Sequence, residues 1–432
     1  MADVPRGGLP AQADTSVRPI VSDRQMDLVQ AISDIGRSPV LPFHANRQSL
    51  LRSGARARNC KDASKRAWLL GGYSSFEPMT NLAKFCLVRS INLPFWRDPM
   101  ANIPLTRCQF LLPFIGILDD IGAPTSSLLE KFRLPSSLED KSDLYIPLLP
   151  TLRFADTAQR SQGIEDLGFL AAQRISYSHM RGKTRTLIAQ SPTLLMALRH
   201  ACRWAPREDT VLSMWIEYDD DHVRICSRLA RTNGFLHLEH AQWIQNIFAI
   251  HIVRQFAGPD WMPATIAFEA CYTPRPATRA FWPNVRFLSG QYAAWVSVPI
   301  SYLSLPGRPG ELGLPPDDHE DGPSAYDIVE LLKLMLPAYL DEEIPGLAAV
   351  AEMAGVSART FQRKLSHLGL AYSDILDTVR YENASKLLRD TEAKIIDVSF
   401  SSGYTDPAHF SRAFRRMAGI TPRQFRKQSR LG

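Results

Sequence analysis

The sequence predicts a multidomain fold with an α+β N-terminal domain, a linker rich in proline, glycine and acidic residues, and an all-α C-terminal domain holding two helix-turn-helix motifs. Three observations predict it. The 432 residues suffice for two or three domains. Segment 305–324 contains nine Pro or Gly and five acidic residues, so it can bury little apolar surface. Helical and alternating apolar patterns mix before this segment, and helical patterns dominate after it.

The composition is that of an ordinary globular chain, with 45% apolar and 22% charged residues. The longest apolar run, 110–118, contains a proline and falls well short of the ~20 residues that a membrane helix needs. The N-terminus lacks the apolar segment of a secretory signal, so we expect a cytoplasmic protein without membrane contact. The six cysteines are spaced too widely for a metal finger or redox motif. Reduced thiols, no metal and no cofactor are therefore expected.

The part before the linker divides into an extension and a patterned domain. Residues 1 to about 66 are rich in Pro, Ser, Gly and Arg with weak periodicity, and we predict a largely disordered extension over 1–90. Residues 91–304 alternate between helical and strand patterns. We expect helices at 127–134, 192–204 and 241–258, a hairpin at 210–230 with an acidic turn, and a short strand at 264–272. The linker is placed at 305–324 and the helical domain at 325–432.

Two segments of the C-terminal domain resemble each other, Val350–Leu365 and Val398–Phe414. Phe361 corresponds to Phe410 and Gly355 to Gly403, with one extra residue in the second turn. Each copy predicts a short helix, a glycine turn and a second helix, which is the helix-turn-helix pattern. Val350, Met353, Phe361 and Leu365 are expected to face the core in the first copy, and Ile395, Val398, Phe410 and Phe414 in the second.

The second helix of each copy leaves a polar, basic outer face. The N-caps are predicted at Ser357 and Asp406, with Pro407 in the first helical turn. Residues 357–432 hold 14 Lys and Arg against seven Asp and Glu, a net charge of +7 on a chain of +6. A basic end on a near-neutral body is consistent with a polyanionic partner, and charge alone fits a solvated tail of scattered charge equally well. The exposed faces are predicted to present Arg359, Gln362, Arg363 and Lys364 in the first copy, and Ala408, Ser411, Arg412, Arg415 and Arg416 in the second.

A helical segment connects the two copies, with Ile375, Val379 and Leu387 at helical spacing. Sixteen residues of helix span roughly 24 Å. Successive major grooves on one side of DNA lie roughly 34 Å apart, so two rigidly held helices could enter both.

These residues resemble the DNA-binding domain of AraC/XylS-type transcriptional regulators. The resemblance rests on "VAEMAGVSARTFQRKL" at 350–365, on Arg380, Ala384, Leu387 and Leu388, and on the stretch 403–426 with its "GITPRQFR" ending. It covers about 105 residues. Ser399 departs from the family, which usually has Ala there.

The resemblance implies which residues contact DNA. By position it assigns base reading to Arg359, Gln362, Arg363, Ser411 and Arg412. Contact with the DNA backbone, or positioning, is assigned to Ser357, Lys364, Asp406, Pro407, Ala408, Arg415 and Arg416. Since Pro407 and Ala408 offer no side-chain hydrogen bonds, we expect the first copy to read most of the sequence and the second to grip phosphate mainly.

Residues 110–305 more weakly resemble the arabinose-binding-type sensor domain of one branch of the same family, through "DDIGAPTSSLLEKFRLP", "IEDLGFLAA", "SPTLLMALRHACRW" and "NVRFLSG". This implies effector binding, dimerisation or both, without assigning effector contacts. "EYDDDH" at 217–222 is interpreted as a solvated hairpin turn rather than a metal site. "HLEH" at 237–240 is interpreted as the polar face of a strand that runs into a helix.

The function predicted is a sequence-specific regulator of transcription, an activator controlled by a small molecule. Its expected partners are double-stranded promoter DNA, RNA polymerase, an unidentified effector and a second copy of the chain. A ligand-independent regulator or scaffold acting through a partner protein is the alternative. An enzyme fused to a DNA-binding module is a third hypothesis, although no nucleophile elbow, phosphate loop or zinc-protease helix is present in the sequence.

Overall fold

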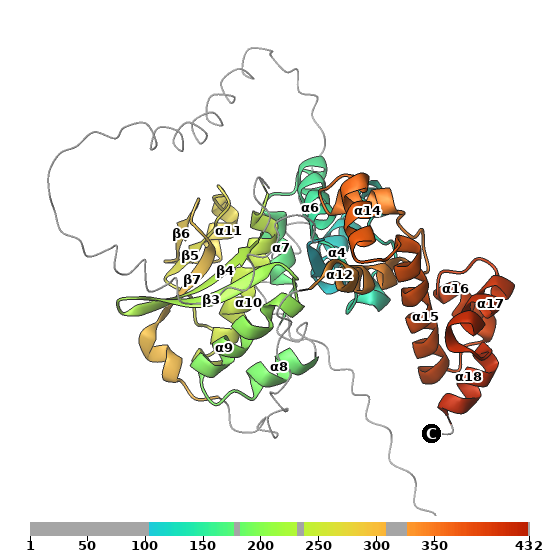
Figure 1. Ribbon diagram of the computed structural model, residues 1–432. Coiled ribbons are helices and arrows are strands. Elements are labelled where there is room, and N and C mark those ends of the chain that lie inside the picture. Colours follow the sequence, from blue (N-terminus) through green and yellow to red (C-terminus); the bar gives the residue numbers. More distant parts are fainter. Residues whose placement is uncertain (1–102, 177–181, 231–236, 308–325, 431–432) are drawn as a thin grey trace, which may run out of the picture. The chain divides into compact units, whose positions relative to one another are not determined.

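The computed structural model describes residues 103–176, 182–230, 237–307 and 326–430 (Figure 1). The predicted extension 1–90 lies outside them, as does most of the predicted linker. In agreement with the predicted fold class, an α+β part precedes a part whose regular elements, in the described residues, are all helical.

The α+β part is built around a five-stranded sheet with the order β3-β4-β7-β5-β6. Its pairs are antiparallel except β5–β6, which is parallel. A separate antiparallel pair joins β1 and β2. The strands are β1 (Leu105–Arg107), β2 (Tyr145–Pro147), β3 (Leu212–Asp219), β4 (His222–Leu229), β5 (Thr265–Ala267), β6 (Arg286–Leu288) and β7 (Ala294–Pro299).

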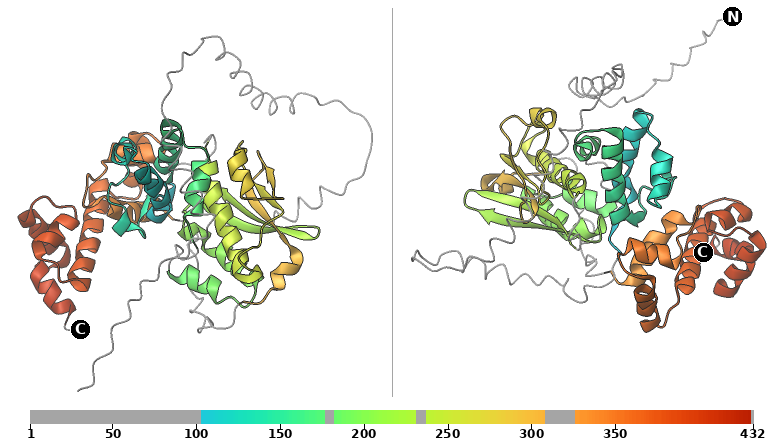
Figure 2. Two further views of the ribbon diagram at one scale, coloured as in Figure 1. Left: turned by 180° about the vertical axis from the view of Figure 1, so that it is seen from behind. Right: turned by 90° about the horizontal axis from the view of Figure 1, so that it is seen from above.

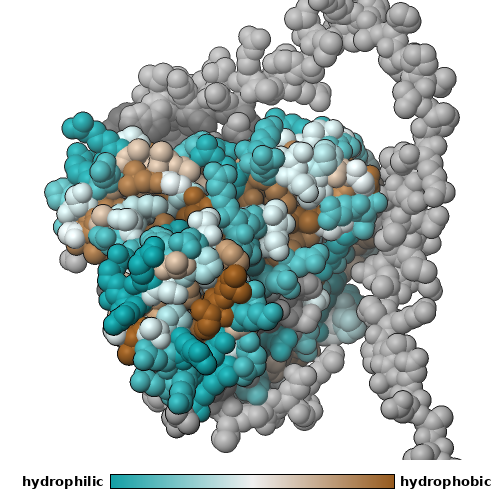
Figure 3. Space-filling model, turned by 90° about the vertical axis from the view of Figure 1, so that its right-hand side faces the viewer, coloured by the Kyte–Doolittle hydropathy of each residue, from teal (hydrophilic) through white to brown (hydrophobic). Residues whose placement is uncertain are grey.

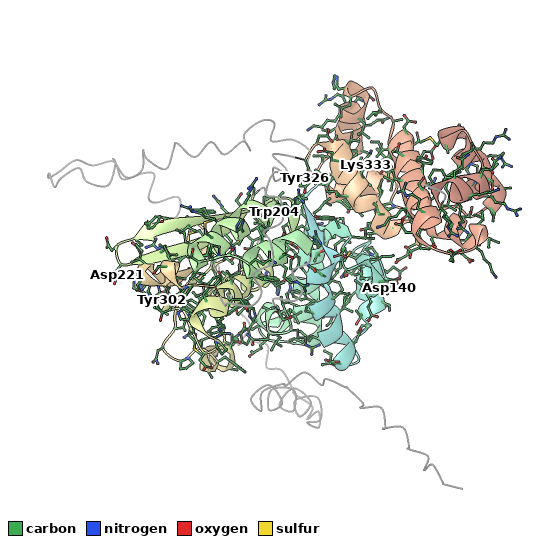
Figure 4. The ribbon with its side chains drawn as sticks, turned by 90° about the horizontal axis from the view of Figure 1, so that it is seen from below. Asp140, Trp204, Asp221, Tyr302, Tyr326 and Lys333 are labelled. Atoms are coloured by element: carbon green, nitrogen blue, oxygen red, sulfur yellow. The ribbon has the colours of Figure 1, made fainter. Side chains whose placement is uncertain are left out.

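The predicted hairpin is confirmed, since β3 and β4 pair throughout, with Leu212 opposite Leu229. Asp220 takes a left-handed conformation in the turn (φ 50°), and the label of Asp221 stands at the tip of this hairpin in Figure 4. The acidic run is therefore a hairpin turn, as interpreted. No cluster of three or more metal-ligating side chains is present among the described residues.

The helices of this part are α4 (Leu112–Asp120), α5 (Thr125–Lys131), α6 (Leu148–Gln162), α7 (Leu167–Gln173), α8 (Gly182–Ala189), α9 (Leu194–Trp204), α10 (Glu239–Ala257) and α11 (Pro276–Ala280), with short 3-10 segments η4 (Cys108–Phe110), η5 (Glu139–Lys141), η7 (Ala205–Arg207) and η8 (Ile300–Ser304). Helices α9 and α10 pack on the five-stranded sheet, and the other helices of this part pack mainly on one another. α10 packs against β4, β7 and α7 (Figure 1). It ends at Gly258, as predicted. No helix within the described ranges has both the length and the apolar character needed to cross a membrane.

The first residues of the predicted linker are structured. Leu305 accepts a hydrogen bond from the backbone N–H of Leu194 at 3.1 Å, and Gly307 donates one to Pro192 at 3.0 Å. A Cβ on Gly307 would lie 2.4 Å from the carbonyl oxygen of Ser191, so only glycine fits this close approach. Residues 305–307 therefore complete the packing at the start of α9.

The C-terminal part consists of α12 (Ile328–Met335), η9 (Leu336–Tyr339), α13 (Leu347–Met353), α14 (Ala358–His367), α15 (Tyr372–Asp390), α16 (Ile395–Ser401), α17 (Pro407–Ala418) and α18 (Pro422–Ser429). α12, α13 and α14 share one hydrophobic core with the α+β part, which includes Leu332 and Phe361. α16 and α17 pack a second core with the end of α15, around Phe410 and Phe414. The two views of Figure 2 agree that the red helices α16 to α18 gather together.

Polar contacts join the α+β part to η9 and the residues that follow it. The buried Lys141 ammonium lies 2.6 Å from Asp341 and 3.0 Å from Glu342, and it also donates to the carbonyl of Ala338. The Glu342 carboxylate accepts from the backbone N–H of Ser136 at 2.8 Å. The α+β part and the C-terminal part are thus joined both by a shared apolar core and by ion pairs.

Candidate nucleic-acid interface

The first helix-turn-helix unit is formed by α13 and α14. Between them Gly355 takes φ 69°, a conformation that favours glycine. The Ser357 hydroxyl accepts a hydrogen bond from the backbone N–H of Thr360 and caps α14, as predicted. Val350 and Phe361 are fully buried and hold the two helices together. α14 therefore starts at a defined residue and turns a defined face outward.

The second unit, α16 and α17, repeats this construction with one more residue in its turn. Gly403 takes φ 78° there. The Asp406 carboxylate caps α17 by accepting hydrogen bonds from the backbone N–H groups of Ala408 at 2.9 Å and His409 at 3.0 Å. These N–H groups hold the pKa of Asp406 below its ordinary value. Pro407 occupies the first helical position, where its missing N–H costs nothing.

The predicted core residues of both units are confirmed. Met353 and Leu365 are buried in the first unit, and Val398, Phe410 and Phe414 in the second. Ile395 is partly buried against the second core. The rings of Phe410 and Phe414 lie 5.8 Å apart at 57°, and that of Phe425 on α18 meets Phe414 edge-on. α17 is thereby locked in rotation about its axis.

The outer face of α14 is open to solvent. Arg359, Gln362 and Arg363 are exposed, and Lys364 is half-buried. The side chains of Arg359, Gln362 and Arg363 make no hydrogen bond or ion pair with another described residue. Arg and Gln side chains can make paired hydrogen bonds to guanine and adenine edges. Three such side chains are therefore available together on one exposed helical face.

The outer face of α17 is more occupied. The Ser411 hydroxyl donates to the carbonyl of Pro407 at 2.9 Å, and Arg412 lies 4.0 Å from the capping carboxylate of Asp406. Arg416 donates to the Asp377 carboxylate of α15 at 2.7 Å. Ala408 and Arg415 are exposed. This face therefore offers fewer polar side chains without an internal partner than the outer face of α14.

The connector α15 has 19 residues, which correspond to about 28 Å of helix. Ile375 and Val379 pack into the first core, and Leu387 packs against the second. The Arg380 guanidinium lies over the Tyr404 ring at 5.0 Å and adds a cation–π contact near the second turn. Because α15 belongs to both cores, it fixes the distance between the two units.

The face shown in Figure 3 is mostly hydrophilic, with separate hydrophobic areas.

The prediction for "HLEH" is wrong about the strand and the polar face, although the helix that it expected does begin within this segment. No strand includes His237 or Leu238, and Glu239 begins α10. His240 is buried, with 1% of its surface exposed, rather than on a polar face. Only glycine fits opposite it, since a Cβ at Gly168 of α7 would lie 2.6 Å from the Cα of His240. Close packing of α7 on α10 therefore buries this imidazole.

Two kinds of residue escaped the sequence reasoning. Asp377 supports the second unit from α15 and nothing in the local pattern marks it, while Arg380, named only as part of the resemblance, was not expected to lie over the Tyr404 ring. Asp209, His240 and Gln245 form a buried polar group in the α+β part. For His240 and Gln245 the only signal is the presence of polar residues inside the otherwise apolar segment of α10, and Asp209, between η7 and β3, has none.

The fold and this face define the class: a DNA-binding protein with two helix-turn-helix units on one chain. A family profile described as "Helix-turn-helix domain" matches residues 350–428. A second, described as "Arabinose-binding domain of AraC transcription regulator, N-term", matches residues 122–306. The chain belongs to the AraC family of transcription regulators, with an arabinose-binding-type effector domain before the DNA-binding domain.

Curated relatives match along nearly their whole length. The chain is 22% identical over 335 residues to the ornithine utilization regulator of Pseudomonas aeruginosa, covering 75% of this chain and 96% of that protein. It is 23% identical over 341 residues to the transcriptional regulator VirS of Mycobacterium tuberculosis, covering 74% of this chain and 96% of that protein. The crystal structure of the regulator CdpR from Pseudomonas aeruginosa is 17% identical to this chain in sequence, with a TM-score of 0.28. The match covers 70% of this chain and 96% of CdpR.

Proposed function

We propose that this regulator is a transcription activator whose first helix-turn-helix unit supplies most of its sequence selectivity. The observation that carries the proposal is the solvent-exposed face of α14. There Arg359, Gln362 and Arg363 have no competing partner among the described residues. Arginine and glutamine are the side chains best suited to paired hydrogen bonds in the major groove.

The second unit would act mainly as an anchor. Pro407 and Ala408, at the start of α17, offer no side-chain hydrogen bond, and Ser411 already donates within the helix. Arg412 and Arg415 supply positive charge, which neutralises phosphate without reading sequence. The Ser357 and Asp406 caps and Lys364 would orient the two helices. Arg416 would position α17 through Asp377 and reach phosphate only after leaving it.

Control by a small molecule is supported by the contact around Lys141. Lys141 and Glu342 couple η5 to the residues that follow η9, and one core continues from the effector domain into α13 and α14. A change in the effector domain would therefore alter the packing of the first reading unit. Homodimerisation, contact with RNA polymerase and a cytoplasmic location complete the proposal. The chain carries no enzymatic activity in this proposal.

Selection of bound DNA from a random pool with the full-length chain tests this function. We expect a conserved block read by α14 and a weaker one about 10 base pairs away. Promoter output with and without the chain then gives the sign of regulation. Recovery of random sequences would overturn sequence-specific binding. Unchanged selection and promoter output after substitution of α14 residues would overturn the assignment to that helix.

A further inference from the structure

A small cavity of about 30 Å³ lies inside the effector domain, between α4, α6 and α10. Most of its wall is apolar and includes Phe110, Phe114, Leu152 and Ile244. Asp209, which follows η7, and His240 and Gln245 of α10 also line it. An apolar wall with a few convergent polar groups is the usual composition of a ligand site.

The three polar side chains are buried and incompletely partnered. Asp209, His240 and Gln245 are exposed by 7%, 1% and 7%. The Asp209 Oδ1 atom, both ring nitrogens of His240 and the Gln245 Nε2 atom have no hydrogen-bond partner among the described residues. Gln245 is oriented by Ser227, whose hydroxyl donates to its Oε1 at 3.0 Å. Because a buried polar atom without a partner is unfavourable, a bound group that satisfies several of them together is favoured.

The cavity favours positive charge. Glu208, next to Asp209, is paired with Arg107 at 3.5 Å, but no described cation lies within ion-pair distance of Asp209. Burial raises the pKa of Asp209 to about 7, and the Glu208 carboxylate adds to the increase. Burial lowers the pKa of His240 to about 3, so the imidazole is neutral and adds no positive charge. A cation that enters would ionise Asp209 and pair with it.

The size of the cavity limits the ligand further. About 30 Å³ is room for roughly two or three water-sized groups. A sugar ring is larger than this, whereas a short chain of a few heavy atoms fits. Asp209 requires a donor, and the Gln245 amide requires an acceptor. A neutral imidazole such as His240 can serve either.

We propose that this cavity binds the polar end of a small organic amine, an ammonium group with a neighbouring hydroxyl oxygen. Asp209 is the charge partner of the ammonium, and Gln245 donates to the oxygen. The inference rests on the proposed effector control and gives it a location and a ligand chemistry. α10 and α6 then sense the ligand, since both line the cavity.

Calorimetry and thermal unfolding of the full chain test the proposal with ethanolamine as the probe. We expect saturable binding and a rise in Tm. Ethylene glycol, which lacks the charge, and choline, which lacks N–H donors and is bulkier, should have no effect. Absence of ethanolamine binding, or an equal effect of ethylene glycol, would overturn the proposal and leave a hydrated structural cavity.

Two variants identify the site. Asp209→Asn should weaken ethanolamine binding at least tenfold, whereas Asp220→Asn, at the exposed hairpin turn, should not change it. Gln245→Met keeps the shape but removes the donor, so it should abolish the preference for ethanolamine over ethylamine. It remains informative if Asp209→Asn folds poorly. Unchanged binding in both variants would overturn the site.

DNA binding by the chain without added amine distinguishes the proposed regulatory function from the proposed amine site. If the chain selects specific DNA but ignores amines, only the amine site fails. If amines bind and no specific DNA is selected, the proposed function fails while the cavity assignment stands.

Discussion

Arg416 of α17 donates to the carboxylate of Asp377 on α15 at 2.7 Å. The contact joins the second reading helix to the connector, between residues that are far apart in the sequence. Arg415, its neighbour, is exposed and makes no ion pair with another described residue. Adjacent arginines therefore have different roles, one holding the helix and the other facing outward.

Replacing Asp377 with Asn should release Arg416 for phosphate contact. An exposed ion pair contributes about 0.2–1 kcal/mol, so stability should fall only slightly. Affinity for random DNA should rise about threefold, and the slope of log K against log salt should steepen by about 0.9. Fluorescence anisotropy at several salt concentrations measures both. Asp390→Asn removes the same charge at the end of α15, and an equal effect from it would mean that net charge alone is responsible.

Arg359→Ala should weaken specific binding by about 1–3 kcal/mol and relax base preference at one position. Arg359 is exposed on α14 and its side chain has no partner among the described residues, so it is available to contact a base, and alanine would remove that contact. Competition between the selected site and its single-base variants measures the effect. Arg286→Ala, an exposed arginine of the effector domain, is the control for loss of one charge. An equal loss on specific and random DNA would assign Arg359 to phosphate.

The parts of the fold that the sequence predicts are those with local causes. The caps at Ser357 and Asp406 and the buried Phe361 and Phe410 follow from spacing within one turn or one repeat. The Arg416–Asp377 pair depends on how α17 lies against α15, so no spacing rule could predict it.

The buried polar group around His240 was missed for a related reason. α10 is buried on nearly all sides, and polar side chains such as Gln242 and Asn246 bond to backbone groups of the sheet region. Its polar residues therefore do not mark a solvent face. In a helix that is buried on nearly all sides, the spacing of apolar residues does not identify a buried face. The sequence therefore does not distinguish a buried histidine from an exposed one.

The two turn glycines should respond differently to alanine. Both have positive φ, which costs an L-residue about 1–2 kcal/mol. A Cβ on Gly355 would meet open space, whereas one on Gly403 would lie 2.9 Å from Ile344 Cδ1 and 3.1 Å from the carbonyl oxygen of Leu340. Gly403→Ala should therefore lose about 1–3 kcal/mol more unfolding free energy than Gly355→Ala. Denaturant titration compares them, and equal losses would show that the chain relaxes around residue 403.

Asp209 should make the protein less stable as the pH rises. Burial raises its pKa in the folded chain to about 7 from an ordinary value of 3.8, so folding takes up a proton between these values. Stability from this group is present at low pH and declines from about pH 4 to pH 7. Asp209→Asn lacks the titration, so its Tm relative to the native chain should increase over that range. A constant difference in Tm would mean that Asp209 ionises normally, and Asp220→Asn serves as the control.

Glu342 should have the opposite pH dependence. Partial burial opposes its ionisation, but the backbone N–H groups of Ser136 and Ser137 and the Lys141 ammonium outweigh that effect and lower its pKa. A lowered pKa contributes stability above the ordinary value of 4.5, and this contribution is lost as the pH falls through the folded-state pKa. Glu342→Gln should therefore destabilise the chain at pH 7 by about 1 kcal/mol, allowing for solvent exposure, and by less near pH 3. Denaturant unfolding at both pH values measures the change, with the exposed Glu343→Gln as its matched control. If the two variants behave alike, the contact between Lys141 and Glu342 contributes nothing to the coupling of the effector domain to α13 and α14.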